Sequence, residues 1–264
     1  MKILVLGHKG MLGNAVYQYF NDKADVVITD NRWDINGFKI KADFNVDVII
    51  NCIGAIPQKG YTKEEFDSLN SHLPTFLETK ATYSTRDIKI IYPASDCEFS
   101  GNLPFPYKYT NNSKRDAEDD YGKSKVVASV LIESAFKYTK AIRTSIIGHE
   151  LSDKKFSLLD WFLSQEGEVN GYINHWWSGI TSLQWCKVAE DMINNWDNYN
   201  KITQIATDGY SKFTLLKLIK RVYEKDIKIN EYIHKDKINR MLRSDIYVPD
   251  IYSQLMELKQ FYNK

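Results

Sequence analysis

The chain has 264 residues, 43% of them apolar and 26% charged, which suffices to bury one substantial core with a small second lobe. This composition excludes a disordered chain, a collagen and a miniprotein held together by disulfide bonds. Because 35 basic residues are balanced by 34 acidic ones, no overall charge attracts nucleic acid or an anionic membrane.

The three cysteines, Cys52, Cys97 and Cys186, do not have the spacing of a metal site, so we expect no bound metal. Their odd number, together with the lack of a secretory leader, favours a reducing compartment, and we predict a cytoplasmic protein. No apolar run reaches the roughly eighteen residues that a membrane span needs. We therefore expect neither nucleic acid nor a membrane as a partner.

The first half of the chain alternates apolar runs with helical patterns. The run 3–6 predicts a buried strand, and a turn at Gly7 leads into a helix with apolar residues at helical spacing. Further on, the sequence predicts buried strands at 26–29, 46–50 and 88–95, and a helix over 62–84 despite Pro74. Residues 99–118 are rich in Gly, Pro, Asn and Asp and predict a loop.

A helix over 121–140 and a strand over 141–147 continue the alternation, which predicts an α/β fold with a doubly wound parallel sheet. Beyond Gly148 the pattern weakens. There we expect a short helix at 157–165, an aromatic loop at 174–182, a helix at 183–196 and a last strand at 201–209. The remainder of the chain is expected to be mainly helical.

A glycine-rich segment, G-x-x-G-x-x-G, separates the first strand from the first helix. Glycines permit a tight turn and the close approach of a diphosphate, which the free N–H groups and dipole of the helix N-terminus stabilise. The alternative is a glycine turn without a ligand, but this placement favours a dinucleotide. We therefore predict that the cofactor contacts Gly7, His8, Lys9, Gly10, Met11 and Leu12.

Charged residues near the ends of the first two strands bear on the choice of cofactor. Asp30 favours the ribose hydroxyls of NAD, whereas Lys9 and Arg32 favour the 2′-phosphate of NADP. Two cations against one carboxylate tilt the prediction to NADPH over NADH, with solvated surface charges as the alternative. The predicted cofactor site also includes Asn31, Asp34, Cys52, Ile53 and Gly54.

We predict a Rossmann-like NAD(P)-binding domain over residues 1–150, to which 183–210 return. Residues 151–182 and 211–264 are expected to form a small substrate-binding lobe.

Tyr121 and Lys125 lie four residues apart and project from one face of the same helix. An ammonium near a phenol lowers its pKa from about 10, which makes tyrosine a usable acid. Taken alone, this pattern also occurs on lysine-rich surface helices.

Eight segments extend the pattern along the chain: ILVLGHKGMLG, VDVIINCIGA, NSHLPTFLE, PASDCEFSG, DDYGKSK, AIRTSIIG, WSGITSL and SKFTLLKLI. With them the sequence resembles the extended short-chain dehydrogenase/reductase superfamily, and within it the dTDP-4-dehydrorhamnose reductase-like sugar-nucleotide reductases. The resemblance implies a catalytic set of Ser95, Tyr121 and Lys125. It also implies NAD(P)H-dependent reduction of the C4 ketone of a nucleotide-linked 4-keto-6-deoxy sugar, in the synthesis of rhamnose-type glycan precursors.

The resemblance further implies substrate contacts at Ser95, Asp96, Cys97, Trp177, Thr181 and Arg240, with Trp176 in the same loop and Arg243 as another candidate for the diphosphate. The tryptophans are equally compatible with a lobe core, and the arginines with a solvated face. Three departures from the family pattern are Ala94-Ser95-Asp96 in place of Ser-Thr-Asp, Val126-Val127-Ala128-Ser129 where a Gly-Glu pair often follows, and Ile180 where proline often precedes the threonine. The last departure bears on the identity of the substrate.

Two other functions remain open. In related GDP-fucose synthases a cysteine at the position of Cys97 is an acid/base for epimerisation, so a bifunctional 3(,5)-epimerase/4-reductase of a UDP- or GDP-linked 4-keto sugar is one alternative. A small buried residue is the plainer interpretation of Cys97. His149 and His175 are further acid/base candidates. A non-catalytic, cofactor-binding regulatory subunit is the alternative from another class, and a homodimer is compatible with each.

Overall fold

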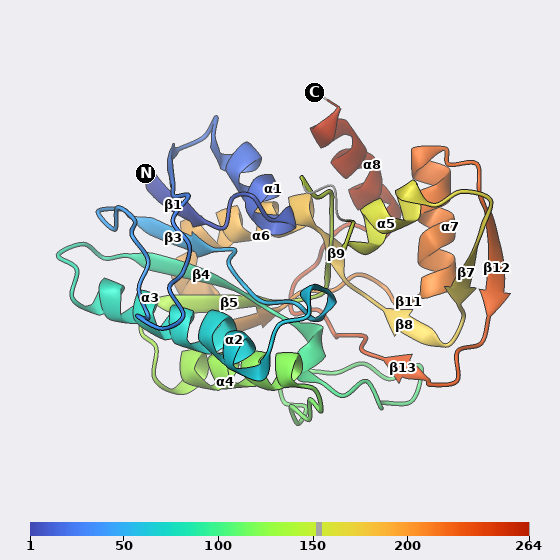
Figure 1. The fold of residues 1–264 in the computed structure, drawn as a ribbon, viewed down its shortest axis with the longest axis horizontal. Helices are drawn as coiled ribbons and strands as arrows, with labels where there is room; N and C mark the ends of the chain where they lie inside the picture. Colours follow the sequence, from blue (N-terminus) through green and yellow to red (C-terminus); the bar gives the residue numbers. More distant parts are fainter. Residues whose placement is uncertain (152–154, 264) are drawn as a thin grey trace.

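A computed structural model describes residues 1–151 and 155–263 of the chain. Figure 1 shows a parallel sheet with its helices in one half of the molecule and smaller strands with the last two helices in the other half. Residues 152–154 and 264 of the predicted substrate lobe lie outside the described part. Within the described residues, no helix is long and apolar enough to cross a membrane.

The central sheet is wholly parallel. Its order across the described residues is β10 (Ile202–Gln204), β5 (Thr139–Arg143), β4 (Lys89–Ala94), β3 (Val48–Asn51), β1 (Lys2–Leu6) and β2 (Asp25–Ile28). The chain runs outward from β1 to β2 and then crosses to β3 on the other side of β1. This reversal of direction creates the crevice at the carboxyl ends of β1 and β3 where open α/β sheets bind ligands.

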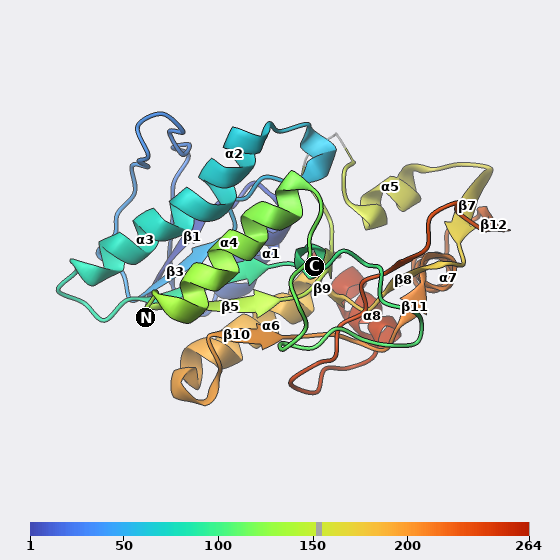
Figure 2. The same ribbon diagram turned by 90° about the horizontal axis from the view of Figure 1, so that it is seen from below.

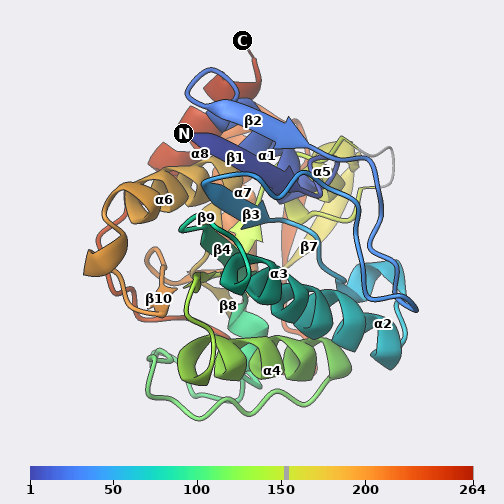
Figure 3. The same ribbon diagram turned by 90° about the vertical axis from the view of Figure 1, so that its left-hand side faces the viewer.

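Helices cover both faces of this sheet because the apolar side chains of its strands alternate. Ile3 and Val5 of β1 pack in one core with α1 (Met11–Phe20) and α6 (Ser182–Asn194). Leu4 and Leu6 pack in another core on the opposite face, with α3 (Leu73–Thr82). Figure 3 shows α1 and α6 on one side and α3 and α4 (Asp120–Ser134) on the other.

The helix predicted over 62–84 is continuous but interrupted in its pitch. It consists of α2 (Lys63–Asp67), a π-helical turn at Ser68–His72 and α3, with Pro74 in the first turn of α3. Proline is tolerated there because the π-helical turn bonds the Leu73 N–H to the Ser68 carbonyl, and the Asn70 carbonyl, which an N–H at position 74 would otherwise occupy, accepts the Tyr92 hydroxyl. Figure 2 shows α2 and α3 lying alongside α4.

Apart from the two cores on the faces of the sheet, the lobe has a core of its own, called the second core below, which joins the elements beyond residue 146. It contains Leu159 and Phe162 of α5 (Leu158–Ser164), Leu215 of α7 (Lys212–Tyr223) and Leu255 of α8 (Ile251–Tyr262). Around it, β12 (Lys228–Tyr232) pairs with β7 (Glu168–Tyr172), and β6 (Ile146–Ile147) pairs with β9 (Ile180–Thr181). In a third small sheet, β8 (His175–Trp177) lies between β11 (Tyr210–Ser211) and β13 (Ile238–Asn239). Short 3-10 turns lie at Pro57–Lys59, Asp96–Glu98 and Trp196–Asn198.

The predicted fold class is confirmed, and so is the loop nature of 99–118. Four local predictions are wrong. The strand expected to be buried at 26–29 is a half-exposed edge strand, because only β1 pairs with it in the described sheet. The helix expected over 121–140 ends at Ser134, since residues 139–143 pair with β4. The aromatic loop at 174–182 contains β8 and β9, and the mainly helical remainder contains β11–β13.

Candidate active site

The glycine turn after β1 is shaped to receive a diphosphate. Gly7 has the left-handed φ of 78°, and its carbonyl accepts the N–H of Gly10 at 2.9 Å. A Cβ on Gly13 would lie 2.0 Å from that same carbonyl oxygen. Helix α1 begins directly after Gly10. Because glycine has no side chain, this N-cap makes no side-chain hydrogen bond to the first turn of the helix. The N-terminal N–H groups of α1 are thus available to an anion, and the turn fits a dinucleotide.

We expect Gly13→Ala to lower both the melting temperature and the affinity for NADPH, because the added methyl collides with the Gly7 carbonyl. Overpacking of this kind costs about 1–3 kcal/mol. Gly10→Ala is the matched control for the fold, since its Cβ would lie 3.4 Å from the same oxygen, near ordinary contact. Thermal unfolding with and without NADPH measures both effects. Equal melting temperatures for the two variants would contradict this account of the turn.

The residues predicted to contact the cofactor after β2 are mostly exposed. Lys9 Nζ and His8 Nε2 lie 2.6 and 3.6 Å from Asp30 Oδ1, and hydrogen bonding to Lys9 lowers the pKa of Asp30. Asn31 and Arg32 are exposed. The Asp34 carboxylate accepts backbone N–H groups at Asn36 and Gly37, at 3.1 and 3.0 Å, and so closes its own turn.

The segment after β3 lies against the glycine turn. A Cβ on Gly7 would approach the carbonyl carbon of Cys52 to 2.9 Å and Cγ1 of Ile53 to 3.0 Å. A Cβ on Gly54 would lie 3.8 Å from Nζ of Lys125. Burial raises the pKa of the Cys52 thiol, which therefore stays neutral. This segment connects the glycine turn to the predicted catalytic lysine.

Asn70, in the π-helical turn, was not predicted as a site residue. Its Oδ1 accepts the Ala55 N–H at 3.1 Å, and its Nδ2 donates to Ser124 Oγ at 3.0 Å. The Tyr92 hydroxyl donates to its carbonyl oxygen at 2.9 Å. Asn70 therefore connects the segment after β3 to helix α4. A buried polar residue at a π-helical turn, a feature frequent at functional sites, is the signal that reveals it.

Ser95, Tyr121 and Lys125, the predicted catalytic set, lie at the end of β4 and in the first two turns of α4. Ser95 follows β4 and caps the 3-10 turn Asp96–Glu98, where its Oγ accepts the Cys97 N–H at 3.1 Å. The Ser95 hydroxyl donates to Asp96 Oδ1 at 3.3 Å. Tyr121 lies in the first turn of α4, where the Ser95 side chain acts to lower the pKa of its phenol. The Lys125 ammonium donates to the Pro93 carbonyl at 3.0 Å and lies 4.5 Å from the centre of the Tyr92 ring.

The pKa values differ from the expectation that Lys125 lowers that of Tyr121. Burial is the main cause that raises the pKa of Tyr121, although Ser95 opposes this effect. The Lys125 amine is directed to the Pro93 carbonyl, and burial dominates the pKa of the phenol. Burial lowers the pKa of Lys125 to about 8. At neutral pH the phenol is thus protonated, which is the form that can donate a proton.

Charged groups surround the turn after Ser95. Burial raises the pKa of Asp96 although Arg240 and Lys212 oppose it. Burial, then the charge of Asp96, raises the pKa of Cys97 to about 12. Arg240 donates from Nε and Nη2 to the carbonyls of Phe99 and Ser100, at 3.0 and 3.3 Å. Lys212, which was not predicted, interacts with Asp96 and Cys97 across the interface between the turn and α7.

Other predicted residues lie elsewhere. Trp177 is 3% exposed, lies in the second core and donates to Ser145 Oγ at 2.8 Å, and the fully buried Thr181 caps α6. Trp176 stacks on Phe105, with ring centres 3.8 Å apart, and Arg243 is exposed. The ring nitrogens of His149 bond Asp160 and Tyr223, and Tyr172 and His234 flank His175. Within residues 1–151 and 155–263, no group of three His, Cys, Asp or Glu could hold a metal.

The N-terminal part of the sequence, residues 1–170, matches the RmlD substrate binding domain family. The chain belongs to this family. The resemblance seen in the sequence is thereby confirmed. The match covers the glycine turn and all three residues of the predicted catalytic set, so these features lie inside the part of the chain that defines the RmlD family.

Solved structures share the fold of this RmlD family member over nearly its whole length. A dTDP-4-dehydrorhamnose reductase from Clostridium acetobutylicum has a TM-score of 0.80 at 19% identity, with 100% of both chains covered. One from Bacillus anthracis, in complex with NADP, has a TM-score of 0.80 at 13% identity over 99% of this chain and 98% of its own. A dTDP-glucose 4,6-dehydratase from the same organism, in complex with NAD, has a TM-score of 0.75 at 15% identity, with 100% of this chain and 96% of its own covered. A search of curated proteins gives no match.

Proposed function

We propose that this protein is an NAD(P)H-dependent reductase of the C4 ketone of a nucleotide-linked 4-keto-6-deoxy sugar, of the dTDP-4-dehydrorhamnose reductase type. The observation that carries the proposal is the juxtaposition of Ser95, Tyr121 and Lys125 beside the segment that joins them to the glycine turn. Family membership and the fold shared with dTDP-4-dehydrorhamnose reductases support it. A nucleotide sugar is accordingly the proposed substrate.

Each residue of the set has a separate task. When bound, the nicotinamide supplies the hydride that adds to the carbonyl carbon. Tyr121 donates its phenolic proton to the carbonyl oxygen, so that one hydride and one proton convert the ketone to an alcohol. The Ser95 hydroxyl donates a hydrogen bond to the same oxygen and orients it. The Lys125 ammonium holds the ribose of the cofactor close to the phenol.

The division of labour along the chain is also proposed. Residues 1–150, with 183–210, form the cofactor-binding domain, and residues 151–182 and 211–264 form the substrate-binding lobe. Two contacts support this division: β10 adds to the central sheet beside β5, and α6 packs with α1 in the same core. The second core unites α5, α7 and α8 in the lobe.

We propose that NADPH is preferred to NADH. Lys9 and Asp30 form an ion pair in which both side chains are more than 70% exposed, and such pairs contribute little to stability. A 2′-phosphate can therefore recruit Lys9 together with the exposed Arg32 through charge-assisted hydrogen bonds. Calorimetric titration with both cofactors is expected to give tighter NADPH binding. Equal affinities, or tighter NADH, would overturn the preference.

Epimerisation through Cys97 requires a thiolate that removes a proton next to the ketone. With a pKa of about 12, the thiol is protonated at neutral pH, which favours reduction alone. We expect the product formed in D2O from an already epimerised substrate to contain no deuterium at C3 or C5, and Cys97→Ser to reduce the ketone at a comparable rate. Proton NMR of the product reads both. Deuterium at C3 that disappears in Cys97→Ser would establish the bifunctional enzyme.

The direct test of the proposed function is oxidation of NADPH in the presence of dTDP-, UDP- and GDP-linked 4-keto-6-deoxy sugars. We expect turnover with at least one of them. Binding of NADPH without turnover of any would favour the regulatory subunit, and failure to bind either cofactor would reject both.

A further inference from the structure

A buried ion pair lies behind the turn that follows Ser95. Glu98 and Arg143 are both 0% exposed, and Arg143 Nη2 donates to Glu98 Oε2 at 2.8 Å. The half-buried Arg115 places its Nε 3.4 Å from the same oxygen. Buried ion pairs stabilise a fold little, because desolvation of the charges offsets their attraction. The position of this pair therefore suggests a role other than stability.

The Glu98 carboxylate joins the elements that carry the three predicted catalytic residues. Its Oε1 accepts the Ser129 hydroxyl at 2.8 Å and the Ser95 N–H at 3.5 Å, which closes a capping box around the turn. Ser129 lies one helical turn beyond Lys125 on the same face of α4. Through Arg143 the carboxylate is also anchored to β5, next to β4. Glu98 thus fixes Ser95 relative to Tyr121 and Lys125.

The charge of Glu98 acts on the same site. Around the Lys125 ammonium lie Glu98 and the Cys97 thiol from the turn, the ring of Tyr92 from β4, and the Pro93 carbonyl. Among these groups Glu98 is the principal negative charge that opposes the effect of burial on Lys125. Replacement by a neutral residue would leave the ammonium without this support.

We propose that Glu98 is a positioning residue for the reaction, whose carboxylate fixes Ser95 and maintains the charge of the Lys125 ammonium. The inference rests on the proposed function in so far as Lys125 contacts the bound cofactor. Sequence patterns do not reveal it, because Glu98 and Arg143 are 45 residues apart and each meets the other only in the folded chain.

The test compares two substitutions that separate charge from reach. Glu98→Gln keeps the length and loses the charge, whereas Glu98→Asp keeps the charge and draws the carboxylate back from Ser95 and Ser129. Dissociation constants for NADPH, measured by its fluorescence from pH 6 to 10, and kcat over the same range are the readouts. In the wild type, NADPH binding should weaken and kcat should fall as the pH rises through about 8, where Lys125 loses its proton. This decline is the alkaline limb of the two pH profiles.

In Glu98→Gln we expect this alkaline limb to move to lower pH by about one unit, the usual effect of losing a nearby opposite charge. In Glu98→Asp the limb should stay in place while kcat falls roughly tenfold or more through misplacement of Ser95. A merely structural role would lower the yield of folded protein in both variants without moving the limb. An unmoved limb in folded Glu98→Gln, or full kcat in Glu98→Asp, overturns the inference.

Glu98→Gln removes the charge partner of the buried Arg143, which keeps its hydrogen bond to Asn111 Oδ1 at 3.0 Å, and this variant can fail to fold. A second pair of variants therefore tests the charge from the opposite direction. Arg115→Gln removes a cation beside Glu98, and the limb should then move to higher pH. Glu133→Gln removes the other, exposed partner of Arg115 and should leave the limb in place. An unmoved limb in Arg115→Gln overturns the charge effect. The binding readout needs no substrate, so lack of turnover in the wild type would reject the proposed function alone.

Discussion

Tyr121→Phe is expected to lower kcat at least about 100-fold, the typical contribution of a positioned general acid, while NADPH binding stays nearly unchanged. The phenolic oxygen is the only atom removed, and the ring keeps its packing against Phe66, with ring centres 5.9 Å apart. Because burial holds the pKa of the phenol high, the wild-type proton is available throughout the neutral range.

Steady-state rates and calorimetric titration of NADPH check this prediction. Tyr83→Phe is the matched control, since Tyr83 is 85% exposed at the end of α3 and should tolerate the same change. Near-normal turnover by Tyr121→Phe would show that another group donates the proton.

Lys125→Met is expected to abolish turnover and to weaken NADPH binding, and at the same time to raise the melting temperature. Burial lowers the pKa of Lys125 in the folded chain to about 8 from an ordinary value of 10.5. The unfolded chain therefore binds more protons between these values, so this group destabilises the fold most below pH 8 and the penalty disappears as the pH rises towards 10.5. Methionine fills the same apolar space without a charge.

Lys123→Met, on the exposed face of the same helix, is the control and should change neither property. Titration of NADPH and thermal unfolding at pH 7 and pH 10 measure the two effects. The gain in melting temperature should shrink at pH 10. Lys125→Met with unaltered NADPH binding would remove the lysine from the cofactor site.

The sequence predicted the parts of the site that depend on local order. The glycine turn, the hydroxyl after β4 and the tyrosine–lysine spacing on α4 each follow from residues near in sequence, and a strand–turn–helix context places them. The same local logic predicted the alternating strands of the sheet. It wrongly predicted a buried β2, because four apolar or β-branched residues do not reveal that, among the described strands, β1 alone pairs with them.

What the sequence did not predict depends on pairing between distant segments. β12 pairs with β7 and β13 with β8, about sixty residues away, so residues that looked like helix or loop are strands. Asn70, Glu98 and Lys212 gain their roles from contacts across separate elements in the same way. Trp177 illustrates the reverse case, since an aromatic residue predicted to face the sugar lies in the second core.

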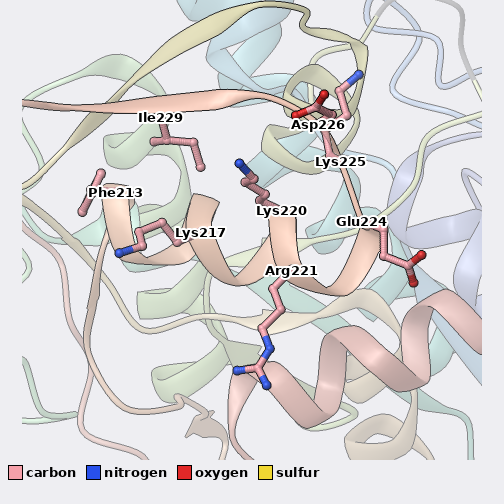
Figure 4. Close-up of a pocket in the computed structure, with 8 residues that line it drawn as sticks. All are labelled: Phe213, Lys217, Lys220, Arg221, Glu224, Lys225, Asp226 and Ile229. Atoms are coloured by element: carbon pink, nitrogen blue, oxygen red, sulfur yellow. The ribbon is translucent and has the colours of Figure 1, made fainter.

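A pocket in the lobe lies apart from the predicted site. Figure 4 shows its lining on α7 and the chain that follows it, with lysine side chains such as Lys217 and Lys220 beside Ile229 of β12. None of the residues predicted to bind cofactor or substrate belongs to this lining. The assignment of function therefore rests on the chemistry of Ser95, Tyr121 and Lys125.

Transfer of deuterium from NADPH that carries deuterium at both hydrogen positions of C4 of the nicotinamide tests the central claim most directly, because either face then delivers a label. The labelled cofactor is incubated with a nucleotide-linked 4-keto-6-deoxy sugar, and the product is examined by NMR and mass spectrometry. The account predicts one deuterium at C4 of the sugar for each NADPH oxidised, with an alcohol in place of the ketone. Unlabelled product, or no oxidation of NADPH with dTDP-, UDP- and GDP-linked substrates alike, would contradict it.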